Sequence, residues 1–62
     1  MKFLRLPEVI SVTGLSRSAL YRLIAEGTFP PSIRIGGRSV AWCDEEVNAW
    51  IEERIRSHRN PD

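Results

Sequence analysis

The feature that most constrains this fold is the stretch 14–26, which reads G-L-S-R-S-A-L-Y-R-L-I-A-E. Gly14 suits a tight turn because glycine adopts positive φ without steric cost, and Ser16 is a favoured helix N-cap. Three apolar residues of the helix that follows fall on one side: Leu20, Leu23 and Ile24. Upstream, residues 7–12 can form another short helix, with Pro7 at its first position. Two short helices joined by a glycine turn predict a helix-turn-helix.

A β-hairpin is predicted after the second helix. Gly27 is placed to end that helix, and Pro30-Pro31 prevents its continuation. Two β-prone runs then flank Gly36-Gly37, which is typical of a tight hairpin turn in which both glycines supply positive φ. Ile33 and Ile35 alternate with polar residues, so we expect the isoleucines to pack and Arg34 to project outward.

A third helix is predicted to begin with Asp44 as N-cap, Cys43 being the alternative one residue earlier. Its buried stripe is expected to comprise Val47, Trp50, Ile51 and Ile55. Glu52 and Arg56 are spaced for an ion pair. The sequence therefore predicts one domain over residues 1–56 and a flexible polar tail over 57–62, with an extended arm at 2–6. Trp42, Trp50 and Phe29 are expected in the core.

The predicted fold class is mainly α with a small β-hairpin. The order helix, turn, helix, hairpin wing, helix is that of a winged helix-turn-helix. Sixty-two residues permit one domain and argue against a large catalytic cleft. The carboxylates of Asp44, Glu45 and Glu46 are explained by a helix start, so we do not expect an enzyme.

The sequence predicts neither a metal site nor a cofactor. Cys43 and His58 are too few for zinc. No apolar run reaches membrane-spanning length, and a cytoplasmic protein is the default expectation.

The charge is distributed unevenly. Residues 1–42 hold six Lys or Arg against two Glu, a net charge of +4, whereas residues 43–62 hold three Arg against six Asp or Glu, a net charge of −3. A basic front suits a module that presents one face to a polyanion. Chance segregation in a small protein is the alternative.

The candidate DNA-binding residues lie on the second helix and the wing. Arginines can reach guanine edges or phosphates, and hydroxyls can reach phosphates or bases. Otherwise these residues form a solvated helix face and a charged strand edge. The candidates are Ser16, Arg17, Ser18, Tyr21, Arg22, Arg34, Gly37 and Arg38.

Several motifs, in order, resemble the AlpA family of phage-type transcriptional regulators over roughly residues 4–55. They are Leu6-Pro7-Glu8-Val9, Thr13-Gly14-Leu15-Ser16-Arg17-Ser18, Leu20-Tyr21-Arg22, Gly27-Thr28-Phe29-Pro30, Gly36-Gly37-Arg38, Val40-Ala41-Trp42 and Val47-Asn48-Ala49-Trp50-Ile51. Cys43 departs from the pattern, since many relatives carry a polar or basic residue there. The resemblance implies a MerR-like winged helix related to phage excisionases, with a recognition helix over 16–26 and a wing over 33–42.

The expected function is sequence-specific binding of double-stranded DNA by a transcriptional regulator of a prophage or mobile element. An excisionase-type recombination directionality factor is the alternative, and a protein-interaction adaptor is a further one. Possible protein partners are further copies of the chain on DNA, RNA polymerase or a recombinase.

Overall fold

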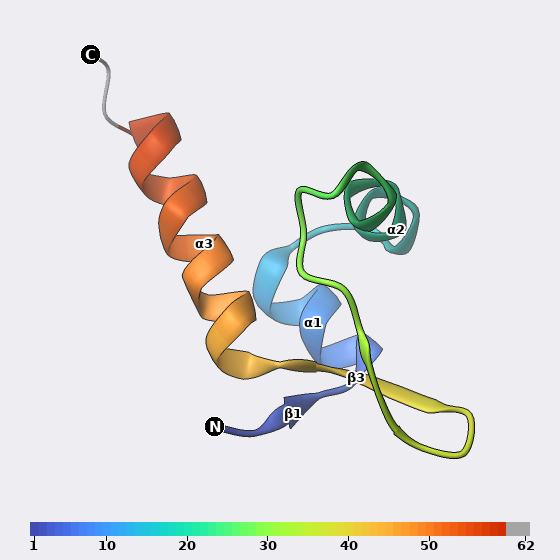
Figure 1. The fold of residues 1–62 in the computed structure, drawn as a ribbon. Coiled ribbons are helices and arrows are strands. Elements are labelled where there is room, and N and C mark those ends of the chain that lie inside the picture. Colours follow the sequence, from blue (N-terminus) through green and yellow to red (C-terminus); the bar gives the residue numbers. More distant parts are fainter. Residues whose placement is uncertain (60–62) are drawn as a thin grey trace.

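The computed structural model describes residues 1–59, and it is a winged helix-turn-helix. Three helices lie on one side of a small three-stranded sheet, as Figure 1 shows. The elements in chain order are β1 (Phe3–Leu4), α1 (Leu6–Thr13), α2 (Arg17–Glu26), β2 (Ile33–Gly36), β3 (Ser39–Cys43) and α3 (Asp44–Arg59). The expected order is confirmed, with one strand added at the N-terminus.

Local sequence signals shape the helix-turn-helix as expected. Gly14 adopts φ 75° after α1, and its N–H donates to the carbonyl of Ile10. The Ser16 hydroxyl oxygen accepts a hydrogen bond from the Ala19 N–H at 3.1 Å, so Ser16 is the N-cap of α2. Gly27 ends α2 at φ 82°. These two positive-φ glycines fix where each helix stops.

The N-terminal arm is the third strand of the sheet. The strand order is β1-β3-β2, with antiparallel pairing and Leu4 opposite Trp42. Paired residues of antiparallel strands share a face, so Leu4 lies beside Trp42 on the face that carries the core. The arm was expected to be extended, and its pairing with β3 goes beyond that expectation.

Asp44 was expected to be the N-cap of α3, and this expectation is wrong. Asp44 instead holds β1 in place through the backbone of Lys2. Helix α3 begins at Asp44 itself, so Cys43 takes the preceding position. The Asp44 carboxylate accepts a hydrogen bond from the Lys2 N–H at 2.9 Å, and the Asp44 N–H donates to the Lys2 carbonyl at 2.9 Å. The Lys2 N–H is the largest cause that holds the pKa of Asp44 below its ordinary value of 3.8.

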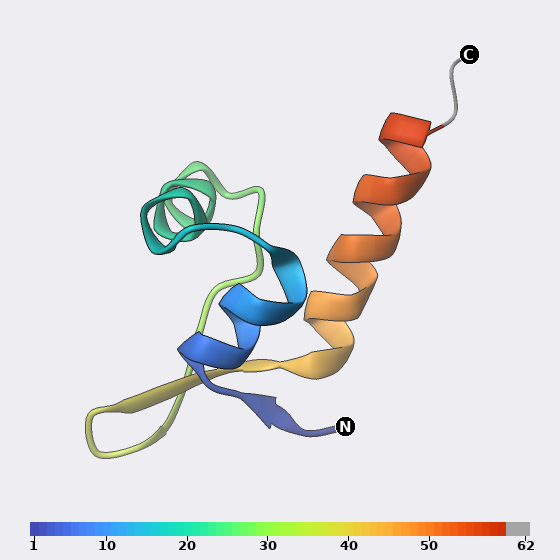
Figure 2. The ribbon, with the colours of Figure 1, turned by 180° about the vertical axis from the view of Figure 1, so that it is seen from behind.

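The core lies where α1, α2 and α3 meet the inner face of the sheet. The largest fully buried side chains are those of Val9, Leu20, Trp42 and Val47. Phe29 is 3% exposed, as expected, whereas Trp50 is only half-buried against the core. Ile55 was expected in the buried stripe and is 45% exposed, because α3 has by then run past the other elements (Figure 2).

Helix α3 continues to Arg59, three residues beyond the expected domain end at residue 56. Residues 60–62 lie outside the described residues, and the flexibility expected for the tail remains a prediction. Arg56 pairs with Glu53, one turn away at i,i+3, rather than with Glu52 as expected. Within residues 1–59, no helix is long and apolar enough to cross a membrane.

Candidate nucleic-acid interface

The outer side of α2 presents four of the candidate residues to solvent. They are Arg17, Ser18, Tyr21 and Arg22, and all are exposed. The buried residue of this helix is Leu20, which anchors the opposite side in the core. The apolar side therefore fixes the helix, and the polar side is left free for a ligand.

Two of the α2 candidates are partly engaged within the protein. The Ser16 hydroxyl oxygen caps the helix, which leaves its hydrogen free to donate outward. Arg22 lies 3.9 Å from the Glu26 carboxylate, and both side chains are more than half exposed. Such a surface pair contributes little stability, so Arg22 can exchange Glu26 for a phosphate at small cost.

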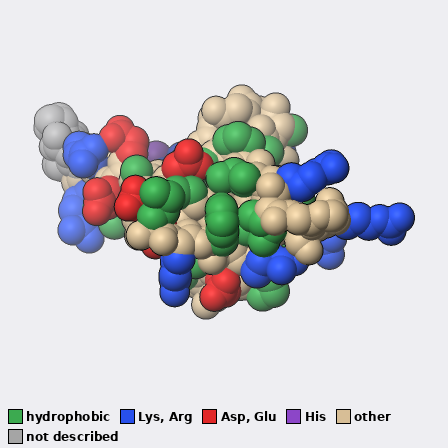
Figure 3. All heavy atoms as spheres, turned by 60° about the horizontal axis from the view of Figure 1, so that its bottom comes forward, with side chains coloured by type: hydrophobic (Ala, Val, Ile, Leu, Met, Phe, Trp, Pro, Cys, Tyr) green, Lys and Arg blue, Asp and Glu red, His purple; other side chains and the backbone are tan. Residues whose placement is uncertain are grey.

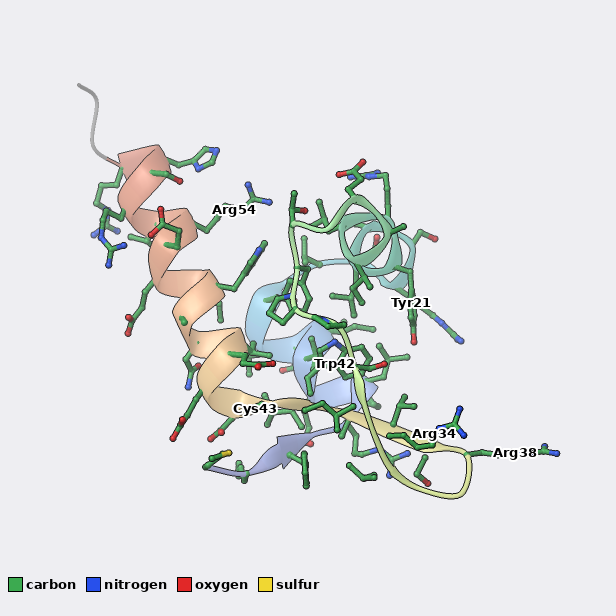
Figure 4. The ribbon with its side chains drawn as sticks, viewed as in Figure 1. Tyr21, Arg34, Arg38, Trp42, Cys43 and Arg54 are labelled. Carbon is green, nitrogen blue, oxygen red and sulfur yellow. The ribbon has the colours of Figure 1, made fainter. Side chains whose placement is uncertain are left out.

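The hairpin turn consists of Gly37 and Arg38, which places Arg38 at the tip of the wing. Gly37 has φ 52°, as expected, but Gly36 is the last residue of β2 and its φ is not positive. In Figure 4 the Arg38 side chain points away from the body of the molecule. A cation at the end of a projecting hairpin is well placed to reach a polyanion.

The wing carries Arg34 on the opposite face from the one expected. Arg34 is opposite Val40, and Val40 shares a face of β3 with the buried Trp42. Ile33 is opposite Ala41 on the outer face, and Ile33 and Ile35 are each 39% exposed. The expected packing of the isoleucines is therefore wrong. The reason is that β2 is an edge strand reaching beyond the helices, as Figures 1 and 2 show, so that the core does not cover its inner face.

Positive side chains gather at the wing end of the molecule. Figure 3 shows Lys and Arg side chains around the hairpin, whereas both signs of charge alternate along α3 at the other end. In Figure 4 the labelled side chains Tyr21, Arg34 and Arg38 all lie on the side formed by α2 and the wing. These three candidates, one from α2 and two from the wing, therefore share one side of the molecule.

The loop between α2 and the wing is held by two indole groups. Trp42 Nε1–H donates to the Pro30 carbonyl at 3.1 Å, and Trp50 Nε1–H donates to the Thr28 carbonyl at 2.6 Å. Between these points, the Phe29 ring packs edge-on to Trp50 with centroids 4.9 Å apart. Arg54 covers the Trp50 ring at 4.8 Å. These contacts fix how α2 and the wing are joined.

The sequence analysis assigned the two tryptophans to the core and missed this positioning role. The available signal was the indole N–H, because a tryptophan in or beside a core usually finds an acceptor for it. No sequence pattern states which acceptor that is.

One hollow of the described surface lies apart from these residues. It is lined by Lys2, Leu4, Glu8, Ser11, Val12, Asp44 and Asn48, between α1, β1 and the start of α3. Residues 1–59 also contain no group of three His, Cys, Asp or Glu side chains suited to hold a metal ion. The Lys and Arg side chains gather instead around the wing (Figure 3).

Comparison with known proteins places the chain in a family. Residues 2–55 match the family described as prophage CP4-57 regulatory protein (AlpA). The protein ORF88 of Enterobacteria phage P4 is 50% identical over 58 residues, covering 94% of this chain and 66% of the phage protein. The DNA-binding transcriptional activator AlpA of Escherichia coli K12 is 32% identical over 62 residues, covering 90% of this chain and 89% of that protein. The matched region includes both helices of the helix-turn-helix, the wing and most of α3, and the chain belongs to the AlpA family of prophage regulatory proteins.

Proposed function

We propose that this protein is a transcriptional regulator of a prophage or mobile element that binds double-stranded DNA in a sequence-specific manner. The observation that carries the proposal is the shared side on which the exposed face of α2 and the arginines of the wing lie (Figure 4). Membership of the AlpA family supports it, because one relative is named as a DNA-binding transcriptional activator.

The proposed mechanism is geometric. Helix α2 enters the major groove, where Arg17 and Arg22 reach base edges or phosphates. The wing lies along the adjacent backbone or minor groove, with Arg38 at its tip. Helix α3 braces the arrangement through the Trp50 contact with the loop. Helix α2 is the element proposed to read bases, because its exposed face carries Arg17 and Arg22.

The same surface also suits an excisionase-type directionality factor. Such a factor aligns several copies on DNA and bends the duplex for a recombinase, and the bending energy depends on the sequence being bent. A regulator instead recruits or blocks RNA polymerase. Both roles use one DNA-binding surface, so the position of the bound sites relative to promoters and recombination sites distinguishes them.

An adaptor is the less favoured function. An adaptor has no need to place its cations together, whereas a DNA-binding protein must do so. The gathering of Lys and Arg side chains around the wing favours DNA (Figure 3).

Selection of duplexes from a random pool tests this proposal. The wild-type protein should enrich a defined sequence. Arg17→Ala or Arg22→Ala should weaken binding by about 1–3 kcal/mol and relax preference at one position if that residue reads a base. Arg38→Ala should weaken selected and random duplexes alike if it contacts phosphate. Uniform loss in all three variants would contradict base reading by α2, and failure to enrich any duplex would contradict DNA binding.

A further inference from the structure

Tyr21 of α2 and Arg34 of β2 face the same space from opposite sides. In Figure 4 the Tyr21 side chain points from α2 toward the wing, and the Arg34 side chain runs along the hairpin toward its tip, with its guanidinium turned to the side on which α2 lies. The pairing of Arg34 with Val40 explains this direction, because Val40 lies on the sheet face that carries Trp42 and the helices.

Both polar groups are available to a ligand. Tyr21 is 43% exposed, and its hydroxyl takes no part in the side-chain hydrogen bonds of residues 1–59. Arg34 is exposed and belongs to none of the ion pairs in that part of the chain. By contrast, Arg22 on the same helix already has Glu26 beside it.

When the protein is bound to DNA, we expect a sugar-phosphate strand to fill the space between α2 and the wing. If a helix lies in the major groove and the wing lies over the adjacent groove, the sugar-phosphate strand that separates the two grooves passes between them. Side chains that line this space meet that strand before they meet a base edge. Arg38, at the tip of the hairpin and pointing away, lies outside the space (Figure 4).

We propose that Tyr21 and Arg34 form a clamp for a single backbone phosphate, on the strand that runs between α2 and the wing. The clamp rests on the proposed DNA-binding function and assigns these two residues to positioning rather than base reading. The phenol O–H donates to one non-bridging oxygen, and the guanidinium donates to the other. The shared phosphate fixes the depth and angle at which α2 enters the major groove.

The two members of the clamp should differ in their response to salt. Arg34 carries the charge that displaces a counterion, so Arg34→Ala should make the slope of log K against log salt shallower by about 0.9. Tyr21→Phe removes a neutral donor, so it should weaken binding and leave the slope unchanged. Because both residues hold one phosphate, the double variant should lose less affinity than the product of the two single losses.

The decisive experiment uses a duplex selected by the wild-type protein, prepared as a series in which each member carries one methylphosphonate. One position in the series should weaken wild-type binding by about tenfold or more, since a hydrogen bond to a charged group is lost. Tyr21→Phe and Arg34→Ala should each become less sensitive to the methylphosphonate at that same position, and the double variant should become insensitive to it. Arg34→Lys, which keeps the charge but loses the planar fork, should keep the wild-type salt slope.

Arg38→Ala is the matched control, because it removes the same charge from the tip of the same hairpin. It should lose sensitivity at a different phosphate. If Tyr21→Phe and Arg34→Ala map to different phosphates, or if their losses multiply, the clamp is overturned while DNA binding stands. If the wild-type protein selects no duplex, the proposed function fails and the clamp fails with it.

Discussion

The dependence of DNA binding on salt can be worked out from the cations of the proposed interface. Four arginines are available on α2 and the wing: Arg17, Arg22, Arg34 and Arg38. Each neutralised phosphate contributes about −0.9 to the slope of log K against log salt on B-form DNA. Four neutralised phosphates therefore give a slope of about −3.6. Raising salt fourfold, from about 50 to about 200 mM, should then weaken binding about 150-fold.

The perturbation that tests this reasoning is Arg38→Ala. Arg38 lies at the wing tip and points away from the body, so its removal should leave the fold intact (Figure 4). The slope should become shallower by about 0.9, and the fourfold increase in salt should then cost about 3.5-fold less affinity than in the wild type. Arg59→Ala makes the same change of charge at the far end of α3 and serves as the control.

Fluorescence anisotropy on a labelled duplex, titrated at five or more salt concentrations, measures both slopes. The control should retain the wild-type slope, because Arg59 is far from α2 and the wing in Figure 1. A wild-type slope shallower than about −2 would refute the four-arginine interface. An equal change of slope in Arg59→Ala would show that net charge, not placement, governs binding.

Three further predictions concern the scaffold. The pKa of Asp44 is lowered chiefly by the Lys2 N–H, so the ionised carboxylate should stabilise the fold at neutral pH and lose this effect as the pH falls below 3.8. The free energies of unfolding of Asp44→Asn and the wild type should therefore differ at pH 7 and converge in acid. Trp50→Phe removes the hydrogen bond to Thr28 and should lower the free energy of unfolding by about 0.5–1.5 kcal/mol, measured by urea unfolding. An unchanged free energy of unfolding would show that this hydrogen bond does not stabilise the fold. Cys43→Ser should keep DNA affinity within a few-fold under reducing and oxidising conditions, since Cys43 is buried and is the free cysteine of the chain; a redox-dependent loss abolished by the variant would contradict this.

The parts of the fold that follow local rules could be predicted from the sequence. Gly14 and Gly27 end their helices in the left-handed conformation, and Ser16 caps α2, because each effect needs only a few neighbouring residues. The core positions of Val9 and Leu20 follow from helical spacing. The exposed face of α2 was predictable for the same reason.

The parts that depend on distant residues could not be predicted. The pairing of β1 with β3 joins Phe3 to Cys43, forty residues apart, and two residues carry no periodicity that would reveal a strand. Alternation in β2 separates isoleucines from Arg34 correctly, but it cannot tell which face the core covers. The isoleucines of β2 were therefore expected on the inner face of the sheet. The helices do not extend far enough to cover that face of β2.

The loop that joins α2 to the wing gives residues outside the proposed DNA-binding surface an influence on the proposed DNA binding. The loop over residues 28–30 takes a hydrogen bond from an indole at each end, one from β3 and one from α3. Because Trp42 is fully buried, its N–H has a fixed position, and so does the carbonyl that receives it. Trp50 is only half-buried, and its contacts with Arg54 and Phe29 limit its motion. The loop thus ties both elements that are proposed to face DNA, α2 and the wing, to the position of the core. A change in α3 that shifts Trp50 would alter the spacing of α2 and the wing, and with it the fit to the two grooves, without removing a single contact to DNA.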